Sequence, residues 1–550
     1  MPSIAYRGWL GGVNQQLPSD QIGDTEVVAA ENVEIDSKAN LVTRAGTVDI
    51  SSSVTGMNSR ITSLYFFQQS DESSAVFATE AGDVRRWNSA TSWPVLSIDG
   101  GAAFSSLPGT ATWYWAVFND KAIAVSGDTT GGTVANAIKI DATTSGATLK
   151  DVSADAAQPN MKYIEVMNSR VFVVDADLPN RIVASKLGDA EAADAWSATG
   201  IAGFYAANVG GDEGGRITAI KQYRGQLVIF KRRRIYALAF GSPNTDTSQW
   251  EIRQLVNNVG CISQNSIQEV LGDLVFLSDE GLMSLQKLLS SGDLASALLS
   301  ENVPALRGVP RSREDYPSIV IPHRSQYAIS IPDVNSGVNE VTWVMDYTLL
   351  SVNGRVAFTS WTGGPAGSAF CQVIDTVGDI RVFVAKEITG GSSAIHRYRN
   401  DTECAADGAA CYQDDGVAYQ TAVVFKALNF DEPLVRKRIH RWGMEFEALT
   451  DPVALSVFLS IDGNDAKARS WQLSFSGLST GSLWDDGLWD SATWASEVST
   501  DTDVWRGVGP PSRFQQVQLS VRASEIDQGV AVKNLGVQVS RLTHRRVKDA

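Results

Sequence analysis

The sequence has no long apolar run, and its first residues carry no export signal. No stretch of about 18 apolar residues occurs, so no transmembrane helix is expected. The longest apolar stretch, residues 453–461, is interrupted by Ser456 and Ser460. The N-terminus lacks a basic segment followed by an apolar one, so a secretory signal is not expected either.

Basic residues are the minority among the charged side chains. The chain has 46 Lys and Arg against 62 Asp and Glu, which gives a formal net charge of -16. Proteins bind nucleic acid by neutralising its phosphates with Lys and Arg, so this chain is a poor candidate for binding DNA or RNA tightly. Nucleic acid that passes nearby without being held is compatible with the composition.

Cysteine is scarce. There are four, at positions 261, 371, 404 and 411, and none belongs to a C-x-x-C pair. A disulfide framework is not expected at this density in so long a chain. Cys404 and Cys411 are near enough in sequence to close a small loop, but free thiols in a reducing cytosol are the favoured interpretation.

The patterns that accompany catalysis or cofactor binding are also missing. The four histidines, at 323, 396, 440 and 544, do not have metal-ligand spacing. No Gly-rich phosphate loop follows a strand and opens a helix. Residues 477–481 match the hydrolase pattern G-x-S-x-G, but a loop rich in Ser, Gly, Asp and Trp follows instead of a helix. We therefore expect no enzyme activity, no metal and no cofactor.

What the sequence does contain is a repeat of short strands, clearest over residues 216–286. Apolar runs alternate there with turns at Gly, Asp and Asn, which is typical of antiparallel meanders. Four such strands form one blade of a β-propeller. The unit recurs from about residue 58, with its first hairpin turn near Ser70-Asp71, Asn119-Asp120, Asn168-Ser169, Arg224-Gly225, Gly272-Asp273, Arg324-Ser325 and Gly378-Asp379.

The spacing of these turns sets the fold class. It runs from about 48 to about 56 residues, in the range of propeller blades. An array of ordinary β-sandwiches is the alternative, but it would not require such regular spacing. The sequence thus predicts an all-β fold with a β-propeller of about six to eight blades over residues 58–400. Leucines at helical spacing predict a short helical insertion near 284–300.

The two ends of the chain differ from this repeat. Residues 1–57 predict an N-terminal arm with a hairpin over 33–43 and a short helix over 25–32, capped by Asp24. Residues 401–550 contain longer strands and predict a C-terminal β-domain of the sandwich type. Within it, residues 474–508 form a Trp-rich loop, in which Trp484, Trp489 and Trp494 recur every five residues.

Three basic clusters stand out against the acidic whole: residues 231–234, 436–441 and 545–548. One interpretation is turn and edge-strand charge, which prevents sheets from pairing edge to edge. The other is contact with acidic surfaces of identical neighbours or partner proteins. Exposed Trp clusters also mark protein contacts, although Trp buried in its own domain is an equal alternative. The candidate contact residues are Lys231, Arg232, Arg233, Arg234, Arg436, Arg438, Arg441, Trp484, Trp489, Trp494, Arg545 and Arg546.

Several of these stretches together resemble one family. The N-terminal pattern Asn32, Asp36, Leu41, Arg44 and Gly46 is similar to one near the start of tail nozzle (tail tubular or tail hub) proteins of short-tailed bacteriophages. The pair GQLVIFKRRRIYAL and GDLVFLSDEGLMSLQ resembles their propeller blades, and AVVFKALNFDEPLVRKRIHRWGMEF resembles their C-terminal β-domain. One departure is Asn40, which stands where a Gly is common; Asn also tolerates the left-handed conformation.

The resemblance implies a structural virion protein located in the tail and made in the host cytoplasm. Six copies would form a ring that contacts an adaptor protein and carries tail fibres or tailspikes. The genome would pass through the ring without being specifically bound. An acidic chain suits this role, because it offers the phosphates of DNA little to adhere to.

A function of another class remains open, namely a carbohydrate-binding or carbohydrate-cleaving propeller adhesin. That function needs aromatic side chains and carboxylates gathered at the axial mouth of the propeller.

Overall fold

The fold was analysed in a computed structural model of the 550-residue chain. The structure describes residues 3–51, 59–88, 92–99, 106–127, 136–144, 146–211, 215–242, 245–309, 316–332, 338–348, 356–375, 378–387, 393–400, 402–404, 408–448, 453–475, 501–508, 513–524 and 529–541. Strands dominate these residues, as expected from the sequence. No helix in this part of the chain is long and apolar enough to cross a membrane.

The chain divides into two compact units. The terminal unit combines residues 1–48, 343–363 and 399–550. The propeller-like unit consists of residues 49–342 and 364–398. The N-terminal segment therefore groups with the C-terminal region, whereas the sequence suggested a separate arm. Strand β6 (Thr47–Asp49) lies at the boundary between the two units in the sequence.

The propeller-like unit is a succession of small, mainly antiparallel sheets, each built mainly from consecutive strands. The first sheets contain β7 (Ile61–Gln68), β8 (Ser74–Glu80) and β9 (Asp83–Arg86); β11 (Tyr114–Phe118), β12 (Lys121–Val125), β13 (Ala137–Ile140) and β14 (Thr148–Asp151), with β10 (Ser97–Ile98) at the edge; and β15 (Met161–Met167), β16 (Arg170–Asp175), β17 (Arg181–Ala184) and β18 (Tyr205–Asn208).

The later sheets contain β19 (Ile217–Tyr223), β20 (Gln226–Lys231), β21 (Arg234–Ala239) and β22 (Glu251–Asn257); β23 (Gln268–Val270), β24 (Asp273–Ser278) and β25 (Gly281–Ser284); β26 (Ser318–Ile321), β27 (Gln326–Pro332) and the first part of β28 (Asn339–Asp346); and β30 (Gly367–Ile374), β31 (Ile380–Glu387) and β32 (Ser393–Tyr398). The residues of β28 from Trp343 onward belong to the terminal unit.

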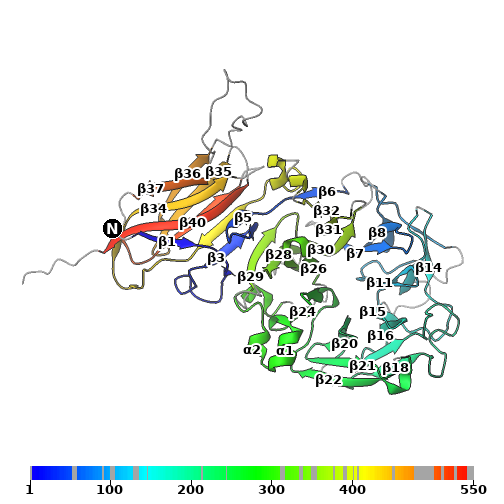
Figure 1. Cartoon of the computed structure of the whole chain (residues 1–550). Coiled ribbons are helices and arrows are strands. Elements are labelled where there is room, and N and C mark those ends of the chain that lie inside the picture. The colour runs from blue at the N-terminus through cyan, green and yellow to red at the C-terminus, as the bar shows by residue number, and fades with distance from the viewer. Residues whose placement is uncertain are drawn as a thin grey trace, which may run out of the picture. The chain divides into compact units, whose positions relative to one another are not determined.

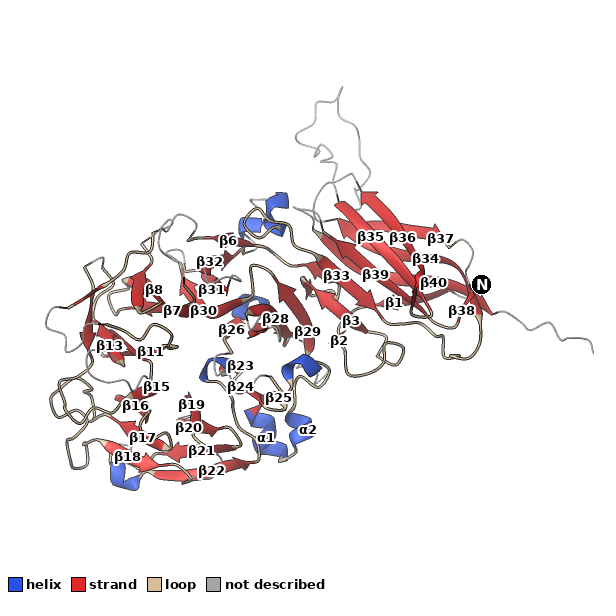
Figure 2. Ribbon diagram, turned by 180° about the vertical axis from the view of Figure 1, so that it is seen from behind, coloured by secondary structure: helices blue, strands red, loops and turns tan. Residues whose placement is uncertain are grey.

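These sheets follow one another around a common centre (Figures 1 and 2). β7 contacts β11, β11 contacts β15, and β15 contacts β19. The short helix η2 (Gln264–Ser266) contacts β19 and β26, β26 contacts β30, and β30 contacts β7 again. The apolar cluster that includes Ile61, Val76, Phe383 and Ile395 joins the first sheet to the last. The contacts between first strands thus close a ring within this unit.

The second strand of each sheet explains why the repeat is visible in the sequence. Strand β16 is buried along its whole length, and β8, β20 and β24 are buried except at their first residue. Each sheet packs between two others, so both faces of this strand contact apolar neighbours. The strand therefore appears in the sequence as a continuous apolar run and not as an alternation of apolar and polar residues. The predicted turns lie between the first and second strands; at Asn119-Asp120, Asn168-Ser169 and Arg224-Gly225 both residues have positive φ. The predicted turn positions are confirmed.

The helical insertion is also confirmed. Helix α1 (Leu285–Ser291) begins at Ser284, whose side chain accepts a hydrogen bond from the backbone N–H of Lys287. Helix α2 (Leu294–Ala297) follows, with Asp293 as its N-cap. Additional single turns of 3-10 helix are η1 (Thr247–Gln249), η3 (Pro304–Leu306), η4 (Pro322–Arg324) and η5 (Gly408–Tyr412).

The terminal unit contains two groups of paired strands that draw on both ends of the chain. One has the order β37 (Asp501–Gly507), β34 (Lys437–Ala448), β40 (Val530–Arg541), β5 (Leu41–Thr43) and β4 (Val33–Ile35), with β1 (Ser3–Arg7) on β40 and β38 (Arg513–Phe514) on β34. The other has the order β29 (Ala357–Thr362), β3 (Glu26–Glu31), β33 (Thr421–Phe425), β39 (Val517–Ala523), β35 (Val453–Ile461) and β36 (Asn464–Phe475), with β2 (Gly12–Val13) on β3.

The residues expected to form a short helix near the N-terminus form a strand instead. Strand β3 pairs with β33, and its Val27 and Ala30 are buried. Local capping signals favoured the helix, but pairing with a strand almost 400 residues later satisfies the same backbone groups and buries more apolar surface. The prediction of a helix over residues 25–32 is therefore wrong, whereas the hairpin of β4 and β5 is confirmed.

Candidate functional site

A pocket lies where the first strands of the propeller-like unit converge. Its volume is about 230 Å³. Its walls come from β7, β11, β15, β19, η2, β23, β26 and β30, so strands from around the ring line it. The centre of a ring of sheets is the one place that every first strand reaches, which is why residues far apart in sequence meet there.

One ion pair lies in this pocket. Lys221 Nζ is 3.4 Å from Glu165 Oε2, and their side chains are 37% and 16% exposed. Burial raises the pKa of the Glu165 carboxyl, and the nearby Lys221 ammonium offsets part of that rise. Glu165 is the only carboxylate among the described residues that line the pocket. The two-carboxylate arrangement of glycoside hydrolysis is therefore not present among them.

Two stacked rings form part of the aromatic wall of the pocket. Tyr65 lies nearly parallel to Trp115, with ring centroids 5.2 Å apart. Behind the pocket, the buried Phe77 stacks on Trp115 with centroids 5.9 Å apart. Trp115 Nε1 donates a hydrogen bond to Ser63 Oγ at 2.9 Å, which fixes the orientation of the indole. Burial raises the pKa of the Tyr65 phenol, so the hydroxyl stays protonated.

Amide side chains complete the lining. Gln264 is held at both ends by the backbone of Ile220, with bonds of 2.7 and 2.9 Å. Gln268 Nε2 donates to the carbonyl of Ser318 at 2.9 Å. The Asn265 side chain and the Tyr65 hydroxyl have no hydrogen-bond partner among the described residues. The pocket thus combines an apolar face with donors and acceptors that are free to meet a small molecule.

A second candidate surface lies on the terminal unit, along β34. Arg436, Arg438 and Arg441 are exposed, as the sequence suggested. Strand pairing places Arg513 of β38 directly opposite Arg438, and Arg513 is exposed as well. Like charges in directly opposed positions destabilise a sheet unless other groups compensate them. Leu434, just before the cluster, is 86% exposed. We call Leu434, Arg436, Arg438, Arg441 and Arg513 the arginine surface.

The cluster over residues 231–234 does not form one surface. Lys231 is completely buried, and its Nζ donates to the carbonyl of Gly211 at 2.9 Å. The expectation that Lys231 contacts a partner is therefore wrong: its side chain turns inward at the end of β20. Arg232 forms two hydrogen bonds with Asp279, at 2.7 and 3.1 Å, and this carboxylate raises the pKa of the guanidinium.

The two remaining members of this cluster differ in exposure. Arg233 is exposed, and Arg234 is half-buried at the start of β21. We expect Lys231→Ala to lower the free energy of unfolding by about 1–3 kcal/mol, because it leaves the carbonyl of Gly211 without this donor and removes a packed side-chain stem. Arg233→Ala in the same turn is the matched control, and thermal unfolding should not distinguish it from the wild type. Equal effects of the two changes would contradict the inward orientation of Lys231.

Five of the sequence candidates have no structural account. Trp484, Trp489, Trp494, Arg545 and Arg546 lie outside the residues that the structure describes, as does most of the predicted loop over 474–508.

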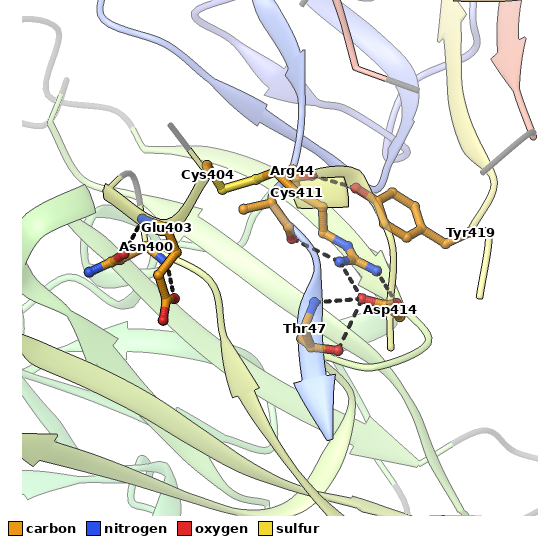
Figure 3. Close-up of a disulfide and its surroundings, with 9 residues drawn as sticks. Arg44, Thr47, Asn400, Glu403, Cys404, Cys411, Asp414 and Tyr419 are labelled. Carbon is orange, nitrogen blue, oxygen red and sulfur yellow. Dashed lines mark hydrogen bonds and ion pairs between the residues drawn. A yellow bond between two sulfur atoms is a disulfide. The ribbon is translucent and has the colours of Figure 1, made fainter. Parts of the chain in front are cut away.

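Arg44, from the family-like N-terminal pattern, lies in a buried polar cluster of the terminal unit together with Thr47, Asp414 and Tyr419 (Figure 3). The guanidinium of Arg44, 1% exposed, contacts both carboxylate oxygens of Asp414, at 2.7 and 3.0 Å. Asn32 Oδ1 accepts from Arg44 Nε at 2.8 Å. Thr47 donates to Asp414 through its backbone N–H and its hydroxyl, both at 3.1 Å. The ring of Tyr419 lies 3.8 Å from the guanidinium carbon.

The other members of the pattern lie in the adjoining hairpin or just after it. Asp36 accepts hydrogen bonds from the backbone of Lys38 and Asn40, which closes the turn between β4 and β5. Leu41 is completely buried. Gly46 passes so close to the backbone of Gln413 that a Cβ there would lie 1.8 Å from its carbonyl oxygen. The pattern thus joins the N-terminal hairpin to the segment that contains Asp414 and Tyr419.

Cys404 and Cys411 form a disulfide beside this cluster, with Cα atoms 4.8 Å apart (Figure 3). The preference for free thiols at these two positions is therefore wrong; short helical turns at both ends of the loop bring the two side chains together. The backbone carbonyl of Cys411 also accepts from the N–H of Gly46 at 2.7 Å. Cys261 and Cys371 are free and buried, which raises the pKa of both thiols, that of Cys261 to about 11. Among the described residues, no group of His, Cys, Asp and Glu has a geometry that would hold a metal ion.

The sequence matches no protein-family model, and no curated protein matches it. Several solved structures share parts of its architecture. The extracellular domain of a one-component system from B. thetaiotaomicron is 12% identical, with a TM-score of 0.38, over 87% of this chain and 62% of that one. The chain thus spans less than two thirds of the length of this structure.

Two smaller structures are matched along nearly their whole length. Virginiamycin B lyase from Staphylococcus aureus is 11% identical, with a TM-score of 0.34, over 63% of this chain and 97% of that one. An oxidoreductase (glucose dehydrogenase) from Thermus thermophilus is 10% identical, with a TM-score of 0.29, over 64% of this chain and all of that one. At these values the likeness carries no argument about what this chain does.

Proposed function

We propose that this chain is a structural subunit of a phage tail, a nozzle or hub protein without enzyme activity. The observation that carries the proposal is the polar cluster around Arg44. Of the family-like pattern, Asn32 and Arg44 belong to the cluster itself and Gly46 lies against the neighbouring Gln413, while Asp36 and Leu41 belong to the hairpin that carries Arg44. In this proposal the sheets of the propeller-like unit are seven blades, and the terminal unit is a β-sandwich.

The closed centre of the propeller-like unit supports an assembly of several copies. Duplex DNA is about 20 Å across, judged from its groove dimensions, whereas the axial pocket is lined by packed side chains and holds about 230 Å³. A genome does not pass along this axis. A conduit made from this chain therefore requires a channel between copies, and the resemblance implies a ring of six. The ring would contact an adaptor protein and carry fibres or spikes.

The charge of the chain suits both parts of the role. The chain carries a net charge of -16, so a channel wall built from it would not neutralise the phosphates of DNA. The duplex would therefore slide through without being held. The arginine surface is the exception. In a ring of identical acidic copies it would meet the acidic surface of the next copy or of an adaptor, and opposite charges would fix the register of the contact.

The direct test is cryo-electron microscopy of the particle or assembly that contains the chain. We expect several copies around an axial channel at least about 20 Å wide. A monomer or trimer at the tip of a fibre would contradict the nozzle proposal.

A charge-reversal pair tests the proposed contact. We expect the double variant Arg438→Glu, Arg513→Glu to remain folded, because both side chains are exposed, and to assemble at least tenfold less readily. Native mass spectrometry at several salt concentrations gives the readout. Arg253→Glu, which changes an exposed arginine of the propeller-like unit, is the control. Unchanged assembly of the double variant would exclude the arginine surface from the contact.

A further inference from the structure

The axial pocket of the propeller-like unit has features that a purely structural core does not need. It is a pocket of about 230 Å³ that opens to solvent and contains an ion pair and amide side chains. The Asn265 amide and the Tyr65 hydroxyl line it without protein partners among the described residues, so they are available to a ligand that displaces water from the pocket.

The charge of the pocket restricts the class of ligand. Glu165 and Lys221 are 3.4 Å apart, so their charges largely cancel. An anion such as phosphate would meet the Glu165 carboxylate, and a cation would meet the Lys221 ammonium. A zwitterion would have to separate the two charges. A neutral molecule fits without breaking the pair, and it can accept from Lys221 while donating to Glu165.

The remaining groups indicate what kind of neutral molecule fits. Tyr65, Trp113, Trp115 and Phe370 give the lining aromatic surface, while the Tyr65 hydroxyl and the Asn265 amide supply donors and acceptors that no described residue uses. A ligand that presents an apolar face and a rim of groups able both to donate and to accept satisfies these requirements together. A pyranose ring has this construction, with C–H groups on its faces and hydroxyls around its edge.

The size of the pocket suits one sugar ring. At about 30 Å³ per liquid water, a hexose displaces about five to six waters, which is within the volume of about 230 Å³. A free monosaccharide or the end of a glycan chain meets this size.

We propose that the axial pocket binds a single neutral sugar ring, with Tyr65 against its face and Glu165, Lys221 and Asn265 along its hydroxyls. The pocket is formed by one chain, so this inference stands independently of the proposed ring assembly. It assigns binding without cleavage, because Glu165 is the only carboxylate among the described lining residues.

The test uses the full chain and a panel of monosaccharides: glucose, galactose, mannose, N-acetylglucosamine, N-acetylgalactosamine and rhamnose. Saturation-transfer NMR and isothermal titration should detect at least one of them with a dissociation constant of about 1 mM or tighter. Glycine serves as the small zwitterion and inorganic phosphate as the anion. If none of the sugars binds, or if only glycine or phosphate does, the proposal is overturned.

Two variants test whether the sugar binds in the axial pocket. Glu165→Gln keeps the shape of the side chain and removes its charge, and Asn265→Ala removes one donor and one acceptor. We expect each to weaken sugar binding at least tenfold while thermal unfolding shows that the chain is still folded. Glu251→Gln, which changes an exposed carboxylate on the outer strand β22, is the matched control and should bind as the wild type does. Binding that both pocket variants leave unchanged would place the sugar elsewhere and overturn the proposal.

Discussion

Arg44→Met should lower the free energy of unfolding of the terminal unit by about 3–5 kcal/mol, because it leaves the buried carboxylate of Asp414 without its main charge partner. Arg44 is 1% exposed and makes two charge-assisted bonds with Asp414. After the change, Asp414 still accepts from the backbone N–H and the hydroxyl of Thr47, which are neutral donors. Chemical denaturation followed by tryptophan fluorescence measures the loss.

Two further variants test whether the loss of stability comes from the unpaired charge of Asp414 and not from the removal of an arginine as such. In the double variant Arg44→Met, Asp414→Asn no charge remains uncompensated, so we expect it to recover part of the loss. Arg253→Met removes an arginine from the exposed pair with Glu251, 64% and 60% exposed, and should change stability little, because solvent screens such pairs. If Arg44→Met and Arg253→Met had similar effects, the Arg44 cluster would not be the structural link that the proposed function relies on.

Gly46→Ala should destabilise the same unit by about 2–4 kcal/mol, because the space for even one methyl group is occupied. The added Cβ would lie 1.8 Å from the carbonyl oxygen of Gln413 and 2.6 Å from its carbonyl carbon. These are backbone atoms, so the two segments have to separate. That movement would also stretch the hydrogen bond from the N–H of Gly46 to Cys411.

Gly146 provides the control for this substitution. A Cβ at Gly146 would approach only the hydroxyl oxygen of Thr144, at 4.0 Å, so the methyl group has room. We expect Gly146→Ala to unfold close to the wild-type midpoint in the same thermal melt. A Gly46→Ala protein with the wild-type melting temperature would show that residues 46 and 413 are not as close as described.

The sequence located the turns of the propeller-like unit well because those turns are decided locally. Asn119, Asp120 and Gly225 tolerate positive φ, and short loops that require it select such residues wherever the sheet lies in the fold. The helices α1 and α2 were found for the same reason, since leucine spacing and the caps Ser284 and Asp293 act within one turn.

Predictions failed where a distant partner decided the outcome. Residues 26–31 pair with the strand of residues 421–425, and no feature of the sequence near either segment indicates that pairing. Lys231 belongs to a basic run whose other members differ in exposure, and only the packing of the unit shows that its side chain points inward. The axial pocket was not predictable at all, because its walls come from segments spread over about 300 residues.

By itself the sequence determined the strand repeat, the turn positions, the helical insertion and the acidic character of the chain, since each depends on neighbouring residues or on composition. The tertiary structure alone decided that both ends of the chain share one unit, that Arg44 pairs with Asp414, that Cys404 and Cys411 are bonded, and that Glu165 meets Lys221 at the centre of the ring. The physical reason is that these contacts arise from long-range strand pairing, in which burial and hydrogen bonding across the whole fold outweigh local preference.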